Sequence, residues 1–221
     1  MEERLQGNPV SEGIAYAKSY IYIPGTLTKA PEFFPKGQEE EKYREFRESC
    51  EKADSELVTL YNGMCKEDPD KAKIFSAHRE LLQDEEILDE IREAICAESM
   101  NPDSAVSKVY TEFAELLAGV EDPLIAERAA DLRDVRDRLL RILSGKETSK
   151  LSSFSEDVIL VAHDLLPSDT ATMDRKHIKG ILTEVGGVNS HSAILARSYG
   201  IPAILGVPNV TEKIPTDTML A

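Results

Sequence analysis

The sequence has no tryptophan, only three cysteines and no long apolar run. A membrane-spanning helix needs about 18 or more apolar residues in a row, and the first residues, MEERLQGNPV, lack the apolar core of a secretory signal. We therefore expect a cytosolic protein without membrane contact. Cys50, Cys65 and Cys96 are odd in number and lack CxxC spacing. This favours buried, reduced thiols over disulfides or a metal site.

Basic side chains are also scarce. There are 26 of them against 41 acidic ones, which gives a formal net charge of -15. Such a chain has little non-specific attraction for nucleic acid phosphates, so a nucleic acid partner is not expected. A basic protein partner fits better. With 221 residues and 41% hydrophobic content, the chain can form one large domain or two small ones, each with its own core.

The middle of the chain has helical periodicity. One apolar stripe begins near residue 38, and a second is interrupted at Asp84, where we expect a kink at a new helix start. Asn101-Pro102 and Asp122-Pro123 are typical helix beginnings. Gly119 and Gly145 are expected helix ends. The pattern predicts four amphipathic helices in antiparallel pairs. The apolar positions are Tyr43, Phe46, Cys50, Ala53, Leu57, Leu60 and Met64 in the first stripe, and Ile74, Ala77, Leu81, Leu88, Ile91 and Ile95 in the second.

The two ends of the chain have sequence patterns that are typical of β-strands. GIAYAKSYIYI (13–23) is rich in β-branched and aromatic residues, while DVILVAHDL, KGILTEVGG and IPAILGV are apolar runs of the buried-strand type. The strands near the C-terminus alternate with short helical pieces. We predict an α/β domain formed by residues 1–30 and 148–221, into which a four-helix, antiparallel, all-α subdomain (33–147) is inserted.

The segment GGVNSHSAILARSYG contains the candidate site. A strand ends at Gly186-Gly187, Asn189 or Ser190 caps a helix, and His191 lies in its first turn. Free N–H groups and the positive end of the helix dipole attract an anion there. The dipole favours the neutral, nucleophilic imidazole, and the glycines leave room for a phosphorylated partner. The pattern suggests a histidine nucleophile that handles phosphate. A capping histidine without chemistry is the alternative.

GGVNSHSAILAR followed by GIPAILG resembles the phosphohistidine signature of the phosphoenolpyruvate-utilising enzymes. NPVSEGIAYA, AKIFSAHRELLQDEEI, ERAADLRDVRDRLLRILSG and VAHDLLPSDTA are similar to the amino-terminal half of Enzyme I of the bacterial sugar phosphotransferase system. The resemblance implies a swivelling phosphohistidine domain and a helical insertion that docks the phosphocarrier protein HPr. It also implies that His191 takes a phosphoryl group from phosphoenolpyruvate and passes it to HPr.

The resemblance assigns further residues. Thr170 would orient His191, or merely support its own short helix. Arg197 would offset phosphoryl charge, or form a structural ion pair. His78 would belong to an exposed His-Leu-Leu docking patch, or be a core histidine. Between residues 36 and 100 there are 19 acidic and 10 basic side chains, which suits a basic partner as well as it suits a solvated helix surface. The implied HPr-binding residues are His78, Leu81, Leu82, Glu85, Glu86 and Arg128.

Three positions depart from the family pattern: Asn189 and Leu166 each stand where threonine is usual, and Pro69 interrupts a stretch that is often acidic. The phosphoenolpyruvate-binding barrel, its Mg²⁺ and most of the dimer interface lie C-terminal to this region in the family. We therefore expect a monomeric chain without a cofactor of its own, cut from a homodimeric enzyme. Two alternatives stay open: an HPr-binding regulatory module without turnover, and the corresponding module of a dihydroxyacetone-type phosphotransferase.

Overall fold

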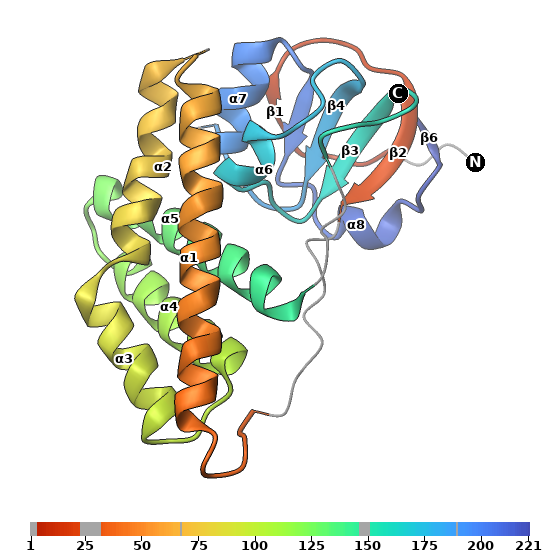
Figure 1. Ribbon diagram of the computed structural model, residues 1–221. Coiled ribbons are helices and arrows are strands. Elements are labelled where there is room, and N and C mark those ends of the chain that lie inside the picture. Colours follow the sequence, from red (N-terminus) through yellow and green to blue (C-terminus); the bar gives the residue numbers. More distant parts are fainter. Residues whose placement is uncertain (1–3, 23–31, 67, 146–150, 189) are drawn as a thin grey trace. The chain divides into compact units, whose positions relative to one another are not determined.

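The computed structural model describes residues 4–22, 32–66, 68–145, 151–188 and 190–221 (Figure 1). The chain divides into two compact units. An α/β unit comprises Met1–Pro24 and Ser149–Ala221, and a helical unit comprises Gly25–Thr148. The helical unit is thus an insertion in the sequence of the α/β unit.

The α/β unit contains a six-stranded mixed sheet with the order β1-β5-β4-β3-β2-β6. The four inner strands, β5, β4, β3 and β2, are parallel, whereas β1 and β6 are antiparallel to their neighbours at the two edges. The strands are β1 (Asn8–Ser11), β2 (Ala17–Tyr22), β3 (Val158–Ala162), β4 (Ile178–Thr183), β5 (Ala203–Leu205) and β6 (Met219–Leu220); the helices are α6 (Pro167–Ala171), α7 (His191–Tyr199) and α8 (Val210–Lys213).

The core of this unit lies on both faces of the sheet. Every residue of β3, VILVA, is buried. Leu160 packs with Leu195 of α7 on one face, and Val161 packs with Val210 of α8 on the other. A strand that is covered on both faces has no polar alternation, which explains its continuous apolar run. The strand expected at 13–23 is shorter than predicted, because residues 12–16 lie outside the strands.

The helical unit contains α1 (Glu39–Met64), α2 (Pro69–Leu82), α3 (Glu85–Cys96), α4 (Pro102–Ala118) and α5 (Pro123–Ser144) (Figure 1). Its described part therefore has five helices, where we predicted four. The expected kink at Asp84 is a full break. Asp84 has an extended backbone, and its carboxylate accepts hydrogen bonds from the N–H groups of Glu86 (3.0 Å) and Ile87 (3.2 Å).

Several helix ends are confirmed. Pro102 and Pro123 are the first residues of α4 and α5, Gly119 directly follows α4, and Gly145 follows α5 with a φ of 63°. Pro69, one of the family departures, begins α2 behind the capping carboxylate of Asp68. Proline is tolerated in the first turn because the N–H that it lacks would have no partner there.

The three cysteines are free thiols, but they do not share one environment. Cys50 is buried, which raises the pKa of its thiol to about 12. Cys96 is exposed, so the expectation of a buried thiol is wrong there. Within the described residues, none of the helices is both long enough and apolar enough to cross a membrane.

Candidate functional site

The turn between β4 and α7 requires glycine at one of its two glycine positions. Gly186 has a φ of 108°, and a Cβ there would lie 3.2 Å from Leu205 Cδ1 and 3.3 Å from Ser190 Oγ. A side chain at this position would be strained in its backbone and crowded by its neighbours. Gly187 is exposed, and a Cβ on it would meet nothing within 4 Å. Its surface is open to an approaching group.

Ser190 is the N-cap of α7. Its Oγ accepts a hydrogen bond from the N–H of Ala193 (3.3 Å) and donates one to the carbonyl oxygen of Gly187 (2.9 Å). This confirms one of the two capping residues that we predicted; the other, Asn189, lies outside the described residues. Gly200 ends α7 in the left-handed conformation, with a φ of 64°, also as predicted.

His191 is the first residue of α7 and is half-buried. The N–H groups of the first helical residues have no partner inside a helix, so those of His191 and Ser192 point out of the helix N-terminus. The imidazole makes no polar contact with the part of the chain that the structure describes. The ring and these donors are therefore available to an incoming group.

Ser192 links α7 to the segment before α6. The side chain is buried, and its Oγ donates to the carbonyl oxygen of Leu165 (3.1 Å). This bond fixes the first turn of α7, and with it His191, against the chain that follows β3. We did not single out Ser192 from the sequence. Its signal is a small hydroxyl residue on the buried face of an otherwise apolar helix.

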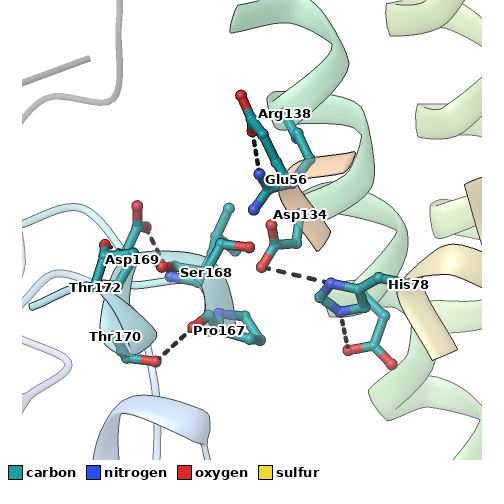
Figure 2. A network of polar contacts seen from close by, with 11 residues as sticks. Glu56, His78, Asp134, Arg138, Pro167, Ser168, Asp169, Thr170 and Thr172 are labelled. Carbon is teal, nitrogen blue, oxygen red and sulfur yellow. Dashed lines mark hydrogen bonds and ion pairs between the residues drawn. The ribbon is translucent and has the colours of Figure 1, made fainter. Parts of the chain in front are cut away.

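Thr170 is 4% exposed and bonds within its own helix. Its Oγ1 donates to the carbonyl oxygen of Pro167 (2.8 Å), as Figure 2 shows. This is the supporting role that we gave as the alternative. A hydroxyl that donates one hydrogen bond can still accept another, so the His191-orienting role that the family resemblance implies stays a prediction.

Leu166 precedes α6, at the position where a threonine would cap the helix. A leucine side chain has no capping oxygen. Asp169 compensates in part, because its Oδ2 accepts a hydrogen bond from the Leu166 N–H (3.0 Å) while its Oδ1 accepts one from the Tyr22 hydroxyl (2.6 Å). The departure at Leu166 thus removes a cap without disrupting α6.

Arg197, in the last turn of α7, contacts carbonyl groups. Its guanidinium donates to the carbonyl oxygens of Val188 (2.8 Å) and Val10 (3.4 Å). In the described chain these contacts take the place of the ion pair that we considered. They connect α7 to the turn in front of it and to β1. Its use in offsetting phosphoryl charge stays a prediction.

The carboxyl ends of β3 and β4 carry a second polar group. Glu184 accepts hydrogen bonds from the backbone N–H and the hydroxyl of Thr211, and His163 Nδ1 lies 2.6 Å from its other oxygen. These contacts, first with Thr211 and then with His163, lower the pKa of Glu184 below its usual value. The ionised carboxylate anchors α8 to the strand end that leads into the glycine turn. The imidazole of His163 is exposed, and its backbone carbonyl accepts hydrogen bonds from the N–H groups of Glu184 (3.2 Å) and Val185 (3.1 Å), just before the glycine pair.

In the helical unit, His78 is fully buried. Its Nε2 lies 3.3 Å from Asp131 Oδ1 and its Nδ1 lies 4.0 Å from Asp134 Oδ2, both on α5 (Figure 2). Leu82 is also buried, at 2% exposure. The expectation of an exposed His-Leu-Leu patch is therefore wrong for these two residues. The alternative, a core histidine, is what the structure shows.

The spacing explains the error. Phe75, His78 and Leu82 follow one another at three and four residues, so they share the buried face of α2. Leu81 lies beside that face and is half-buried, whereas Glu85, Glu86 and Arg128 are exposed. Four of the six residues that we assigned to the partner surface are thus accessible at least in part. Asp131 and Asp134, which hold His78, were not singled out from the sequence.

The comparison with known proteins identifies the family. A family model described as "PEP-utilising enzyme, N-terminal" matches residues 6–128, and one described as "PEP-utilising enzyme, mobile domain" matches residues 154–221. The chain belongs to the PEP-utilising enzymes. The residues of the glycine turn and of α7 all lie within the match to the mobile domain.

The relatives of this chain share one name. The phosphoenolpyruvate-protein phosphotransferases of Mycoplasma capricolum subsp. capricolum and Priestia megaterium are 35% and 38% identical to it over 222 and 221 residues. Both comparisons cover 100% of the chain, which spans 38% of the length of each relative.

A solution structure of Enzyme I matches with a TM-score of 0.78 and 37% identity over 98% of this chain and 88% of that one. The resemblance to the amino-terminal part of Enzyme I is thereby confirmed. The N-terminal domain of Enzyme 1 - Nitrogen, at 24% identity and a TM-score of 0.63, shares the fold.

Charge is unevenly divided between the two units of the chain. The helical unit carries 30 acidic and 18 basic side chains, a net of -12, whereas the α/β unit carries 11 and 8, a net of -3. The acidic surplus therefore belongs mainly to the unit with Glu85 and Glu86. A strong field of one sign steers an oppositely charged partner and raises its rate of association.

Proposed function

We propose that this chain is a phosphoryl-transfer module in which His191 takes a phosphoryl group that originates from phosphoenolpyruvate and gives it to a histidine of HPr. The observation that carries the proposal is the position of His191 as the first residue of α7, behind the Ser190 cap and next to the open surface of Gly187. The name shared by the relatives supports it.

The chemistry follows from that position. In the first step, a bond forms between a ring nitrogen of His191 and phosphorus, and the phosphorus–oxygen bond of phosphoenolpyruvate breaks. In the second step, the new nitrogen–phosphorus bond breaks as a nitrogen of HPr binds the phosphorus. Such transfers have loose transition states that are stabilised by positioning and electrostatics. The N–H groups at the N-terminus of α7 position the phosphoryl oxygens by hydrogen bonds, and the helix dipole stabilises their negative charge.

Several residues of the chain hold the first turn of α7 and the segment before it in position for transfer. Ser190 and Ser192 hold the first turn of α7 in place through their bonds to Gly187 and Leu165. Arg197 holds the turn in front of it through Val188. A phosphoryl group on His191 therefore meets donors that are already oriented, and little reorganisation is needed at the moment of transfer.

HPr would dock on the helical unit. The proposed surface consists of Glu85 and Glu86 at the start of α3, Arg128 on α5 and the half-buried Leu81 at the end of α2. Exposed carboxylates suit a basic partner, and a half-buried apolar side chain such as Leu81 can be covered on binding. The phosphoenolpyruvate site, its Mg²⁺ and the homodimer interface would belong to sequence C-terminal to this module, and the enzyme would work in the cytosol.

The proposal is tested with radiolabelled phospho-HPr and the purified chain. We expect label on the wild type and on His163→Ala, which removes an exposed histidine outside the turn, and none on His191→Ala. The label should be lost in acid and be recovered by fresh HPr. If HPr binds but labels no variant, the result would favour a regulatory module without turnover. If HPr neither binds nor labels the chain, the result would contradict both the transfer module and the regulatory module.

A further inference from the structure

Two large apolar side chains are exposed next to His191. Ile194 follows it by three residues on α7 and is 48% exposed, and Val188 precedes it by three residues and is 60% exposed. Residues three apart on a helix have Cβ atoms about 5–6 Å apart, so Ile194 stands beside the imidazole on the surface of α7. The Arg197 guanidinium donates to the Val188 carbonyl (2.8 Å), which holds the backbone of Val188 beside the same helix. We refer to Val188 and Ile194 as the flanking pair.

The packing of α7 on the sheet does not use the flanking pair. Ala193, Leu195 and Ala196 form the buried face of the helix and belong to the core of the α/β unit. Within the described residues, the flanking pair lies outside the core clusters. One exposed apolar residue needs no explanation, but two that stand on either side of a reactive histidine indicate a surface that another molecule covers.

The flanking pair belongs to a stretch of sequence without carboxylates. Of the 221 residues of the chain 41 are acidic, yet none of residues 185–211 is. On α6, which packs against α7, both oxygens of Asp169 accept hydrogen bonds, one from the Leu166 N–H and one from the Tyr22 hydroxyl. The segment that carries His191 therefore adds no negative charge of its own to repel an arriving phosphoryl group.

Transfer between two proteins brings a partner onto the flanking pair. Reacting atoms must approach to about 3–3.5 Å, so only the phosphoryl group separates the two histidine nitrogens. A protein whose histidine comes this close to His191 must cover the side chains that stand next to it. The centre of a protein interface is rich in apolar side chains and depleted of charged ones. The surface beside His191 has this composition.

On the basis of the proposed function, we propose that HPr covers Val188 and Ile194 during transfer, and that this apolar contact sets the rate of transfer rather than the affinity for HPr. The contact excludes water from the phosphoryl group while it passes between the two nitrogens, which strengthens its attraction to the N–H donors of α7. The affinity comes from the helical unit, whose net charge of -12 attracts a basic partner.

Ile194→Asp and Met219→Asp form a matched pair for the test. Both side chains are 48% exposed, but α7 packs against β1 and β5 at one edge of the sheet, whereas Met219 lies on β6 at the other edge (Figure 1). Single-turnover transfer from saturating phospho-HPr is followed by rapid quench, and binding of HPr by calorimetry. We expect Ile194→Asp to slow transfer about tenfold or more and Ile194→Ser about threefold, with HPr affinity within about twofold of the wild type. Ile194→Leu and Met219→Asp should keep both wild-type values.

The wild type separates this proposal from the proposed function. If HPr does not label the wild type, both are contradicted. If the wild type is labelled and Ile194→Asp and Ile194→Ser transfer at its rate, only the role of the flanking pair is contradicted. Weaker HPr binding by Ile194→Asp at an unchanged rate would also overturn it, because the pair would then supply affinity. Self-association of the free chain that Ile194→Asp abolishes would make a second copy of the chain the occupant.

Discussion

Replacing Ser190 tests the link between the helix cap and phosphoryl transfer. Ser190→Ala removes the Oγ that accepts from Ala193 N–H and donates to the Gly187 carbonyl. Ser190→Asp keeps a capping oxygen, because aspartate and serine are comparable caps, but adds a negative charge where the phosphoryl group arrives. The two variants therefore separate the cap from the charge.

The expected magnitudes follow from these bonds. Loss of an N-cap costs about 1 kcal/mol, which for a chain of this length lowers the melting temperature by about 2–4 °C. If the same 1 kcal/mol is lost from the transition state, transfer slows about fivefold. Ser190→Asp should melt within about 1 °C of the wild type. Two like unit charges 4 Å apart repel by about 1 kcal/mol even in bulk water, so its transfer should also slow about fivefold or more.

Melting is followed by circular dichroism, and transfer by rapid quench with phospho-HPr. The reasoning predicts that alanine lowers both the stability and the rate, whereas aspartate lowers the rate alone. Wild-type melting and transfer in Ser190→Ala would refute the role of the cap. Wild-type transfer in Ser190→Asp would refute the idea that the phosphoryl group meets the N-terminus of α7.

Three further predictions concern stability. Leu166→Thr supplies the missing cap of α6 and should raise the free energy of unfolding by about 1 kcal/mol in urea titrations; no gain would mean that Asp169 already satisfies that helix end. Gly186→Ala should cost about 1–3 kcal/mol because of its positive φ, whereas Gly187→Ala should stay within about 0.5 kcal/mol, and equal losses would contradict the turn geometry. Hydrogen bonds, first from His177, lower the pKa of Asp174 to about 2 from an ordinary 3.8. Its contribution to stability is therefore present above about pH 4 and lost toward pH 2, so the difference in urea midpoint between wild type and Asp174→Asn should shrink over that range; a constant difference would contradict it.

The sequence predicted helix starts and ends reliably where a residue type, such as proline or glycine, is strongly preferred at one position of a helix end. The prolines at 102 and 123 begin helices, Asp84 and Ser190 cap them, and Gly145 and Gly200 follow them with positive φ. Each of these residues acts on backbone groups within a few positions of itself. No knowledge of the tertiary fold is needed to place them.

Predictions that depend on tertiary contacts were less reliable. The surroundings of His78 come from Asp131 and Asp134, more than 50 positions along the chain, and its place on the buried face of α2 was visible only in its spacing from Phe75. Cys96 ends an amphipathic helix and is exposed although its neighbour Ile95 is fully buried. Apolar character alone does not say which side of a helix end faces the core.

The turn between β4 and α7 depends on local sequence signals and also on tertiary contacts. The order glycine, cap and histidine is local and was predicted, including the first-turn position of His191. The contacts that hold it, from Ser192 to Leu165 and from Arg197 to Val10, join segments 27 and 187 positions apart. Such contacts could not be derived from spacing within one segment.

The central claim is that His191 alone carries the phosphoryl group, and peptide mapping at alkaline pH tests it most directly. The chain has four histidines, His78, His163, His177 and His191. After incubation with phospho-HPr, mass spectrometry should find close to one phosphate per chain, on the peptide that contains His191, and fresh HPr should remove it. Phosphate on another histidine, or none on a chain that binds HPr, would contradict the account.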